Sequence, residues 1–375
     1  MTRLLGVVHI VPHLHYGGAE RMAVHLMTKL DSTRFRVSAI SLSRQSGSDL
    51  ERMLQARHIS VSYMGKNSGF DPRMFTRVNC ALREYRPDIV HTHVHVLRYA
   101  LPSLLLRRPA VVVHTVHNLA EQEVEPRARW IQRLAFCSGI VPVSVAYEVA
   151  ASLERVYGIR EGLVVPNCIP VETYRNPSCS RAAWRTKERF RQDSMLFACI
   201  AQFRPQKNHR LLLEAFASGP ARDSTVHLIL AGTGETLEAT KRQSEELGIS
   251  DQVHFLGPRE DIPEVLGAVD AFVLASDFEG NPLAVMEAMA AGLPVAITRV
   301  GGVPEILESG VEGIVVAPGD VRSLAEAMVI LVENPSMRLR MGTAGAERAR
   351  KFFDVSTMVC AYTRIYENLL KQPKG

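Results

Sequence analysis

The strongest constraint on the fold of this chain is a regular alternation of short apolar runs with longer amphipathic segments, which continues through most of its 375 residues. The apolar runs have the length of strands and the amphipathic segments have the length of helices. Strands that are apolar throughout and separated by helices are typical of parallel sheets buried on both faces. The alternation therefore predicts an α/β protein with doubly wound sheets.

The alternation runs in two blocks. Residues 170–194 interrupt it with the turn-formers Pro170, Asn176 and Pro177 and then with the basic stretch 181–191. We interpret this segment as the connection between two domains plus the first helix of the second. The expected strands are 5–11, 36–42, 59–63, 88–92, 110–115, 140–143 and 163–165 in the first block, and 196–200, 227–230, 253–256, 271–274, 295–298 and 313–316 in the second.

The length of the chain exceeds the usual size of one core, and an apolar content of 46% is enough to build two. We expect one domain at 1–172 and a second at 173–352, followed by a C-terminal segment at 353–375. That segment contains an amphipathic helix near 355–371, which either binds a partner or braces another part of the chain. Ligands bind at the carboxyl ends of doubly wound sheets, so we expect the active site between the two domains.

The net charge of +5 is unevenly distributed. Residues 1–170 carry 21 Lys and Arg against 13 Asp and Glu, a net charge of +8, and the remainder therefore carries −3. A basic first domain suits a phosphate-bearing substrate or an anionic membrane surface. A solvated surface without a special role explains the same charge equally well. A nucleic-acid partner is disfavoured, because no basic run is interleaved with aromatic residues.

The six cysteines are scattered without a Cys-x-x-Cys pair, which favours reduced thiols and a cytoplasmic location. The first apolar run is short and ends at Pro12 without a small-residue cleavage site, so we interpret it as a strand rather than a signal peptide. No apolar run is long enough to span a bilayer.

Two carboxylates, Glu279 and Glu287, lie eight residues apart behind the apolar run 271–274. A strand that delivers one carboxylate, followed by a helix that carries a second, suits hydrogen bonding to a polyhydroxy ligand. The start of that helix, after Pro282, also favours an anionic group. Helix capping is the structural alternative for Glu279. A purely structural role is less favoured for Glu287, because apolar neighbours enclose it and a buried carboxylate needs partners.

Residues 279–295 read Glu-Gly-Asn-Pro-Leu-Ala-Val-Met-Glu-Ala-Met-Ala-Ala-Gly-Leu-Pro-Val, and this motif resembles the retaining glycosyltransferases of GT-B fold, family 4 (the group 1 glycosyl transferases). The resemblance implies that Glu287 holds the ribose hydroxyls of a nucleotide-sugar and that Glu279 contacts the transferred sugar. It also implies that the helix start faces the sugar and the diphosphate, through Gly280, Asn281, Pro282 and Leu283.

Gly17 and Gly18 follow the first strand, where a turn without side chains lets backbone N–H groups approach a phosphate. Taken alone, two glycines usually mark an ordinary turn. Together with the next residues, however, they resemble the Gly-Gly-Ala-Glu-Arg element of the family. The resemblance implies that these glycines approach the donor diphosphate or the reacting sugar.

Arg204 and Lys207 follow the first strand of the second domain, and two cations at a strand end suit a diphosphate. An ordinary basic loop is the alternative. The family usually has an arginine five residues before this lysine, where this chain has Gln202. We expect Arg204 to substitute for it.

His117, which is followed by Asn118, comes after the strand at 110–115 and resembles the His-Asn pair that lines the reacting centre on the acceptor side. His114 is the competing assignment. Farther along, Gly232 and Gly234 form a poor dinucleotide fingerprint, because Leu237 occupies the third glycine position. By resemblance, this turn lies near the nucleotide.

Two further residues follow from the resemblance. Arg259 matches the segment that cradles the base, and we expect it to contact the donor. Glu305 lies in the matching sequence Gly-Gly-Val-Pro-Glu, and we interpret it as structural because it orders the loop near a helix start.

His91, His93 and His95 raise the hypothesis of a metal site, because alternate positions of a strand share one face. We expect the strand to end near Thr92, which would break that face. The corresponding His-x-His pattern of the family is not a metal site, and no acidic ligands cluster nearby. We therefore predict no metal.

The resemblance covers nearly the whole chain and implies two Rossmann-like GT-B domains that face each other across a cleft. The first domain would bind the acceptor and the second the donor, and the C-terminal helix would cross back to the first. No cofactor is implied, since the nucleotide-sugar is a co-substrate. Lys207 and Arg204 would neutralise the leaving group as its charge develops. Retention of configuration is implied by the family alone.

The predicted activity is transfer of a sugar from a UDP- or GDP-linked donor to a glycan, lipid-linked, phosphorylated or small-molecule acceptor, in the synthesis of a cell-surface polysaccharide or glycolipid. The inner face of the membrane stays open as a location. A sugar-nucleotide epimerase and a non-catalytic nucleotide-binding subunit are the alternatives. The first would need further acid and base residues around the sugar, and the second is disfavoured by the intact motif.

Overall fold

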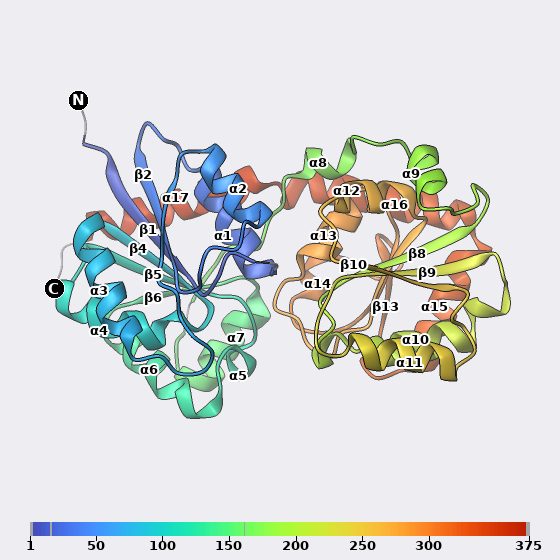
Figure 1. Cartoon of the computed structure of the whole chain (residues 1–375), viewed down its shortest axis with the longest axis horizontal. Helices are drawn as coiled ribbons and strands as arrows, with labels where there is room; N and C mark the ends of the chain where they lie inside the picture. Colours follow the sequence, from blue (N-terminus) through green and yellow to red (C-terminus); the bar gives the residue numbers. More distant parts are fainter. Residues whose placement is uncertain (1–2, 16, 161, 373–375) are drawn as a thin grey trace. The chain divides into compact units, whose positions relative to one another are not determined.

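The computed structural model describes residues 3–15, 17–160 and 162–372. The chain divides into two compact units (Figure 1). Unit 1 joins Met1–Cys168 to Val355–Gly375, and unit 2 is Ile169–Asp354. The sequence predicts boundaries after residues 172 and 352, a few residues from these.

Unit 1 is built on a seven-stranded sheet with the order β3-β2-β1-β4-β5-β6-β7. Its strand pairs are parallel. The winding reverses between β1 and β4, which makes their carboxyl ends a topological switch point where ligands bind. The strands are β1 (Leu5–Val11), β2 (Phe35–Ser41), β3 (Ser60–Tyr63), β4 (Ile89–His93), β5 (Val111–Val116), β6 (Val141–Ser144) and β7 (Leu163–Val164).

Helices cover both faces of this sheet, and the last helix of the chain is one of them. α17 (Val355–Lys371) packs beside α1 (Figure 1), and its buried Tyr362 and Tyr366 join the core of unit 1. The Tyr366 hydroxyl lies 2.6 Å from Nδ1 of His91. The other helices are α1 (Gly18–Lys29), α2 (Asp49–Ala56), α3 (Arg73–Tyr85), α4 (Leu97–Arg107), α5 (Ala120–Glu123), α6 (Arg129–Cys137) and α7 (Tyr147–Tyr157).

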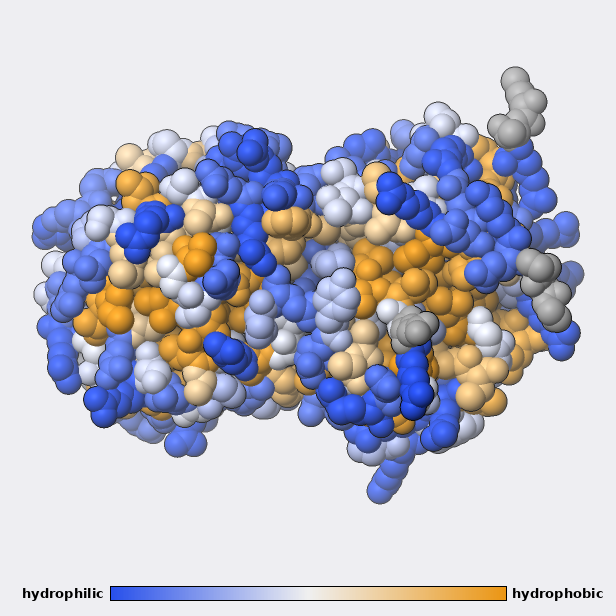
Figure 2. Space-filling view, turned by 180° about the vertical axis from the view of Figure 1, so that it is seen from behind, coloured by the Kyte–Doolittle hydropathy of each residue, from blue (hydrophilic) through white to orange (hydrophobic). Residues whose placement is uncertain are grey.

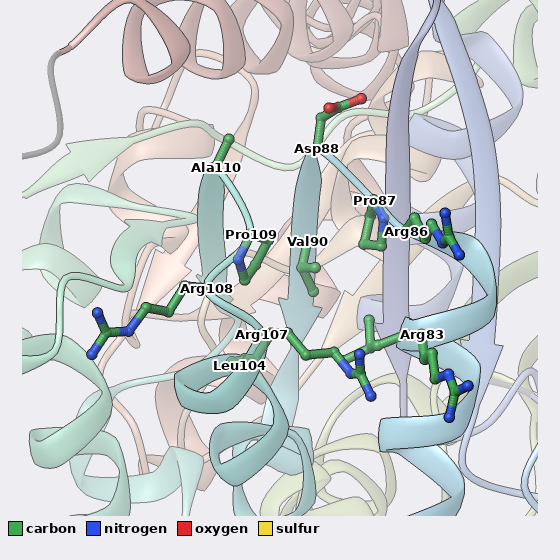
Figure 3. A pocket seen from close by; sticks show the side chains of 11 residues that line it. Arg83, Arg86, Pro87, Asp88, Val90, Leu104, Arg107, Arg108, Pro109 and Ala110 are labelled. Atoms are coloured by element: carbon green, nitrogen blue, oxygen red, sulfur yellow. The ribbon is translucent and has the colours of Figure 1, made fainter.

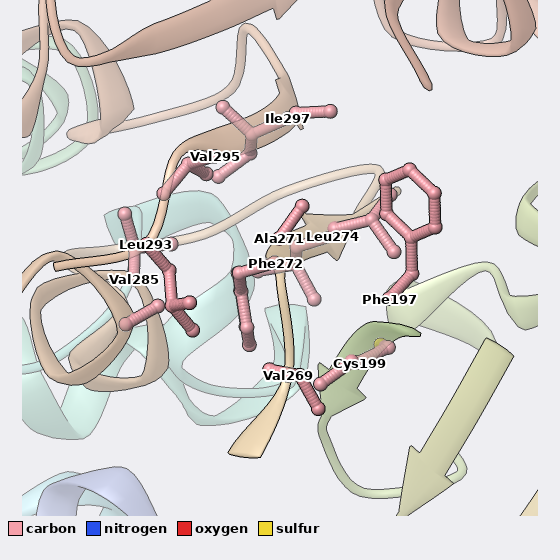
Figure 4. Close-up of a cluster of buried hydrophobic side chains, with 14 of the residues drawn as sticks. Phe197, Cys199, Val269, Ala271, Phe272, Leu274, Val285, Leu293, Val295 and Ile297 are labelled. Atoms are coloured by element: carbon pink, nitrogen blue, oxygen red, sulfur yellow. The ribbon is translucent and has the colours of Figure 1, made fainter. Parts of the chain in front are cut away.

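Unit 2 is built on a six-stranded sheet with the order β10-β9-β8-β11-β12-β13, again with parallel pairs. Figure 4 shows Phe197, Phe272 and Ile297 of three neighbouring strands packed in its core. Burial of each such side chain contributes roughly 1.5–3 kcal/mol. The strands are β8 (Met195–Ile200), β9 (Val226–Ala231), β10 (Val253–Gly257), β11 (Ala271–Leu274), β12 (Val295–Thr298) and β13 (Gly313–Val316).

The basic stretch at the start of unit 2 is part of its fold. Arg185, in α9, is fully buried, and its guanidinium donates to the Ala268 carbonyl at 2.8 Å and pairs with Asp270 at 2.8 Å. The charge of this arginine is therefore committed to holding α9 on the sheet. The helices of unit 2 are α8 (Val171–Arg175), α9 (Arg181–Lys187), α10 (His209–Ser218), α11 (Leu237–Glu246), α12 (Ile262–Ala268), α13 (Leu283–Ala290), α14 (Val303–Ile306), α15 (Val321–Glu333) and α16 (Pro335–Phe352).

The surface carries hydrophobic residues outside the cores. On the face that Figure 2 presents, hydrophilic residues form most of the outline and hydrophobic residues gather within each unit. In unit 1 four exposed apolar residues belong to α4 and α6, which pack against each other. They are Leu105, Leu106, Trp130 and Leu134, and Leu106 and Trp130 are 72% and 65% exposed.

The six cysteines are all free thiols, as the sequence predicts. Across the described residues, no helix combines the length and the apolar character that crossing a membrane requires.

Candidate active site

The two acidic residues of the principal motif lie in unit 2, on either side of the start of α13. Glu279 is in the loop that connects β11 to α13, and Glu287 lies just over one turn into the helix. Both are buried, with exposed fractions of 6% and 1%. A buried carboxylate is costly unless other groups compensate it, so the partners of each one define its role.

Glu279 is held by a hydroxyl and a cation. Its Oε1 accepts a hydrogen bond from Ser276 Oγ at 2.6 Å and forms an ion pair with Lys207 Nζ. Lys207 follows β8 and Glu279 follows β11, and these two strands are neighbours in the sheet. Their carboxyl ends therefore bring a strand-end cation and a strand-end carboxylate together, although the sequence separates them by 72 residues.

Glu287 is held by a residue that sequence reasoning missed. The hydroxyl of Tyr174 donates to Glu287 Oε1 at 2.9 Å, and Tyr174 itself is buried. Tyr174 lies in α8, within the segment interpreted as a connection, and 113 residues separate it from Glu287. No local pattern connects the two positions, so the sequence offers no signal for this contact.

A second loop fixes the loop that carries Glu279. Gly301 has a positive φ of 48°, and a Cβ atom on it would lie 1.6 Å from the Glu279 carbonyl oxygen. The Gly302 N–H donates to the Gly280 carbonyl at 2.9 Å. Only glycine at 301 allows the two backbones to approach this closely. Asn281 is buried beside them, and no side chain caps the start of α13 after Pro282.

The loop after β8 is connected to the same site. Asn208 donates to Asp277 Oδ1 at 2.7 Å, and the Asp277 N–H donates to the Gln206 carbonyl at 2.8 Å. Arg204 is exposed in this loop, and among the described residues its guanidinium has no ion-pair partner. Of the two cations predicted here, Lys207 is thus engaged with Glu279, whereas Arg204 is accessible to a ligand.

Arg259 lies just beyond β10 and is engaged with acidic residues. Its guanidinium contacts Asp261 Oδ1 at 2.6 Å and Glu188 Oε1 at 2.9 Å. These contacts raise the pKa of Arg259 and hold the pKa of Asp261 below its usual value. The contact between Arg259 and a base stays a prediction. Such a contact would have to use guanidinium N–H groups that do not bind these carboxylates.

In unit 1, Gly17 and Gly18 form the start of α1 at the carboxyl end of β1. Gly17 precedes the helix in an extended conformation, without a capping side chain. A Cβ atom on Gly17 would lie 2.1 Å from the carboxylate of Glu20, so a larger residue at this position would displace that carboxylate. Glu20 is buried and lies 3.5 Å from His13. This carboxylate makes the turn a poorer site for a diphosphate than the glycines alone suggest.

His117 follows β5 directly and lies at the same edge of the sheet. Its Nε2 is 3.2 Å from Nδ1 of His93, and its backbone N–H donates to Glu123 Oε1 at 3.3 Å. Burial lowers the pKa of His117 to about 3, so the ring is neutral. His114, the competing assignment, lies inside β5, where its Nδ1 is 2.9 Å from Thr92 Oγ1.

Glu123 is a further residue that sequence reasoning missed. It is buried behind His117. Burial raises the pKa of Glu123 to about 8, and the negative charge of Glu20 adds to the shift. Glu123 lies only six residues after His117, but nothing in the sequence distinguishes it from the nearby Glu121 and Glu125.

The histidine pattern 91, 93 and 95 requires a correction. β4 continues to His93 rather than ending near Thr92, so His91 and His93 do share a face. The third histidine near them is His9 of β1, not His95. Both nitrogens of His91 are already engaged, by Tyr366 and by Thr115. The reason from strand length is therefore wrong, and the prediction of no metal stays a prediction.

A separate hollow of about 470 Å³ lies in unit 1, away from these residues. It is formed by the ends of α3 and α4 and the starts of β4 and β5, which is the amino edge of the sheet. Figure 3 shows Arg83 and Arg107 turned to one side and Arg108 directed away from them. No predicted site residue lines it.

Two doubly wound parallel-sheet units in one chain, one of them with an ion pair between the buried Glu279 and the partly exposed Lys207 at its carboxyl edge, define the class of nucleotide-sugar-dependent glycosyltransferases with the GT-B fold. HepE of Anabaena, solved in complex with UDP-glucose, superimposes with a TM-score of 0.85 at 20% identity, covering 97% of this chain and 100% of that one. This likeness shows the fold.

The comparisons of sequence identify the family. Residues 16–173 match Glycosyltransferase Family 4, and residues 180–348 match Glycosyl transferases group 1. A D-inositol 3-phosphate glycosyltransferase of Geodermatophilus obscurus is 32% identical over 313 residues, which are 75% of this chain and 67% of that one. The chain therefore belongs to the group 1 glycosyltransferases of family 4.

An Escherichia coli enzyme described as UDP-Gal:alpha-D-GlcNAc-diphosphoundecaprenol alpha-1,3-galactosyltransferase is also similar. It is 26% identical over 273 residues, which are 69% of this chain and 70% of that protein.

Proposed function

We propose that this protein transfers a sugar from a UDP-linked donor to a hydroxyl of a glycan or lipid-linked acceptor, with retention of configuration. The observation that carries the proposal is the Ser276–Glu279–Lys207 cluster at the carboxyl end of β11, with Glu287 buried just beyond it. The UDP-glucose bound by HepE and the UDP-galactose and lipid-linked substrates of the E. coli relative support the choice of donor and acceptor.

Lys207 and Glu279 would exchange partners when the donor binds. Without a ligand, each one neutralises the other. A nucleotide-sugar offers a diphosphate to the ammonium group and hydroxyls to the carboxylate, so both groups stay compensated when their mutual contact loosens. Lys207 would then stabilise the charge that develops on the leaving diphosphate, and the accessible Arg204 would add a second cation.

Glu287 would bind the ribose. A carboxylate with two oxygens can accept hydrogen bonds from two adjacent hydroxyls, and Tyr174 fixes its orientation. The uncapped start of α13, from Gly280 to Leu283, would present backbone N–H groups to the sugar and the diphosphate. This assignment needs no metal and no cofactor.

We assign the acceptor side to unit 1. Glu20 lies over Gly17, and its carboxylate makes this turn better suited to sugar hydroxyls than to a diphosphate. Of the two possibilities that the family resemblance leaves for the glycines, we therefore propose the reacting sugar. The neutral ring of His117 would contact the same kind of group. Retention rests on the family resemblance.

An anionic membrane surface is proposed as a partner of the acceptor domain. The exposed residues of α4 and α6 combine leucines and a tryptophan with arginines, a composition suited to a membrane interface. The basic charge of residues 1–170 points in the same direction. A lipid-linked acceptor would be reached from such a surface. The residues concerned are Leu105, Leu106, Arg107, Trp130, Arg133 and Leu134, together with Arg108 directly after α4.

The donor site is tested by two variants. Glu287→Ala removes the proposed ribose contact, and hydrogen bonds to a charged group are worth about 1.5–3 kcal/mol, so UDP affinity should fall roughly 10- to 100-fold. Glu279→Gln should lower kcat far more than it weakens UDP binding. Calorimetric titration with UDP and release of UDP from a panel of UDP-sugars measure the two effects.

Glu333→Gln, which neutralises an exposed glutamate of the same unit, is the matched control and should bind UDP normally. Undiminished turnover of Glu287→Ala would refute the donor assignment. Equal loss of affinity and turnover in Glu279→Gln would argue against its contact with the sugar. A changed free nucleotide-sugar without a transfer product would indicate an epimerase instead.

A further inference from the structure

Three histidine rings form a continuous hydrogen-bonded chain across the sheet of unit 1. Nδ1 of His9 lies 3.1 Å from Nε2 of His93, and Nδ1 of His93 lies 3.2 Å from Nε2 of His117. The rings of His9 and His93 are nearly parallel, with 12° between their planes. His93 is the middle member, and it uses both of its nitrogens.

The order of the strands brings these residues together. β1, β4 and β5 are adjacent, and their register places His9 beside His91 and His93 beside Thr115. His93 is the last residue of β4, and His117 is the first residue after β5. The chain of rings therefore leads from inside the sheet to its carboxyl edge.

Each of the three rings is neutral at physiological pH. Burial lowers the pKa of His9 and His117 to about 3 and holds the pKa of His93 well below its usual value. A neutral imidazole has one N–H group and one lone pair, so each contact in the chain needs a donor on one side and an acceptor on the other. The tautomers of the three rings are therefore coupled, and only two arrangements satisfy both contacts.

The two arrangements differ at the ends of the chain. The end atoms are Nε2 of His9 and Nδ1 of His117, and both are buried without a hydrogen-bond partner among the described residues. If His117 donates to His93, an N–H group is left unpaired on His9. If His9 donates to His93, Nε2 of His9 is left with an unpaired lone pair. His117 then carries its N–H group on Nδ1, where that group is unpaired.

The second arrangement is the more stable one. Each arrangement leaves one unpaired N–H group, on Nε2 of His9 in the first and on Nδ1 of His117 in the second. His9 is fully buried within the sheet, whereas His117 is partly exposed, so the unpaired N–H group costs less on His117. His117 lies at the edge of the sheet, where a bound ligand can satisfy its N–H group. We propose that His93 is a positioning residue that fixes His117 in the tautomer with the proton on Nδ1, so that His117 acts as a hydrogen-bond donor to a sugar oxygen and not as a general base.

This inference rests on the proposed function only in the identity of the ligand that meets His117. The tautomer itself is measured without substrate. In protein labelled with 15N-histidine, long-range 1H–15N correlation spectra distinguish protonated from unprotonated ring nitrogens. We expect the His117 ring, assigned with His117→Asn, to carry its proton on Nδ1. A proton on Nε2 of His117 would overturn the inference.

Two substitutions of His93 separate its chemistry from its volume. His93→Phe keeps a flat ring but removes both nitrogens, so His117 should lose its single tautomer and kcat should fall roughly 10- to 100-fold, as when other outer-shell partners are removed. His93→Gln offers one acceptor for His9 and one donor for His117, and it should retain the tautomer and most of kcat. KM for the donor should change little in either variant.

His25→Phe is the matched control, since His25 is also a buried neutral histidine of unit 1 but makes no contact in this chain. Circular dichroism and Tm establish that each variant folds. A single Nδ1–H tautomer in His93→Phe would overturn the inference, and so would an unchanged kcat in that variant. The UDP titration of Glu287→Ala is independent of His93, so it shows separately whether the donor assignment fails.

Discussion

Glu123 illustrates at the scale of one residue how the fold changes the chemistry of a side chain. It is enclosed behind His117, and its Oε1 accepts the His117 backbone N–H at 3.3 Å. Burial raises the pKa of its carboxyl group from 4.5 to about 8, with a further contribution from Glu20. The group is therefore protonated in the folded protein at neutral pH, whereas it is ionised in the unfolded chain.

This difference predicts a dependence of stability on pH. At Glu123 the folded state binds more protons than the unfolded state between pH 4.5 and 8, so the contribution of Glu123 to the free energy of unfolding should fall as the pH rises through this window. Buried neutral histidines such as His9 and His117 contribute in the opposite direction below pH 6.5, so the effect of Glu123 is read from the difference between a variant and the unmodified protein. Glu123→Gln cannot ionise and should remove that contribution, which amounts to at most a few kcal/mol, on the order of 1.4 kcal/mol per pKa unit. Urea unfolding at pH 5 and pH 8 measures it.

The matched control for this experiment is Glu125→Gln, which changes an exposed glutamate two residues away and should behave like the unmodified protein. An identical change of stability between pH 5 and pH 8 in Glu123→Gln and the unmodified chain would show that Glu123 is ionised in both states.

The sequence predicts single residues unevenly. Glu279, Glu287 and Lys207 were predicted from residue type and motif, and the structure places all three at the carboxyl side of one sheet; their roles stay predictions. Tyr174 and the burial of Glu123 could not be predicted, because contacts that are distant in sequence decide both. The local sequence does not show which of Glu121, Glu123 and Glu125 the fold encloses.

At the scale of elements, the loop that holds Glu279 depends on another loop for its shape. The backbone of Gly301 lies against the Glu279 carbonyl, with no room for a Cβ atom. The position of the Glu279 carboxylate is thus set by the packing of one strand-end loop on another. A change at Gly301 should affect activity without altering any polar group.

Gly301→Ala tests this dependence. The alanine would combine a positive φ with a steric clash, and strained backbone of this kind costs on the order of 1–3 kcal/mol. Tm should fall and kcat should fall with it, because Glu279 would be displaced. Gly319→Ala is the control, since Gly319 has a positive φ of 78° but nothing lies within 4 Å of its Cβ position. Equal effects of the two substitutions on kcat would contradict the proposed bracing.

Most elements could be predicted from hydrophobic periodicity. The strands at 5–11, 271–274, 295–298 and 313–316 have the predicted bounds, because each is a short apolar run between turn-formers. α5 and α8 were not predicted, since helices of four and five residues are too short to show a period. The predicted end of β4, at Thr92, is one residue too early. The prediction therefore missed that His93 lies in the strand, next to the rings that it contacts.

At the scale of the whole molecule, the charge is polarised along the chain, with +8 on residues 1–170 and −3 on the rest. If the basic part docks on an anionic membrane, the protein should bind vesicles of phosphatidylglycerol and phosphatidylcholine at low salt and should be released at high salt. Cosedimentation measures both effects, and vesicles of phosphatidylcholine alone should bind far less protein.

The contribution of α6 is tested with Trp130→Ala, which should weaken vesicle binding several-fold by removing an interfacial anchor. Tyr147→Ala is the matched control, because Tyr147 is an equally exposed aromatic residue of unit 1 that lies on α7. Absence of binding to anionic vesicles at low salt would dismiss the membrane as a partner.

α17 has a consequence for how the protein is made. Most of unit 1 precedes unit 2 in the sequence, yet the core of unit 1 includes Tyr362 and Tyr366, which follow unit 2. Unit 2 is contiguous and ends at Asp354. During synthesis, therefore, the second unit has all its residues before the first one does, which reverses the usual N-terminal-first order. The first unit stays incomplete, with part of its apolar surface uncovered, until α17 has been synthesised.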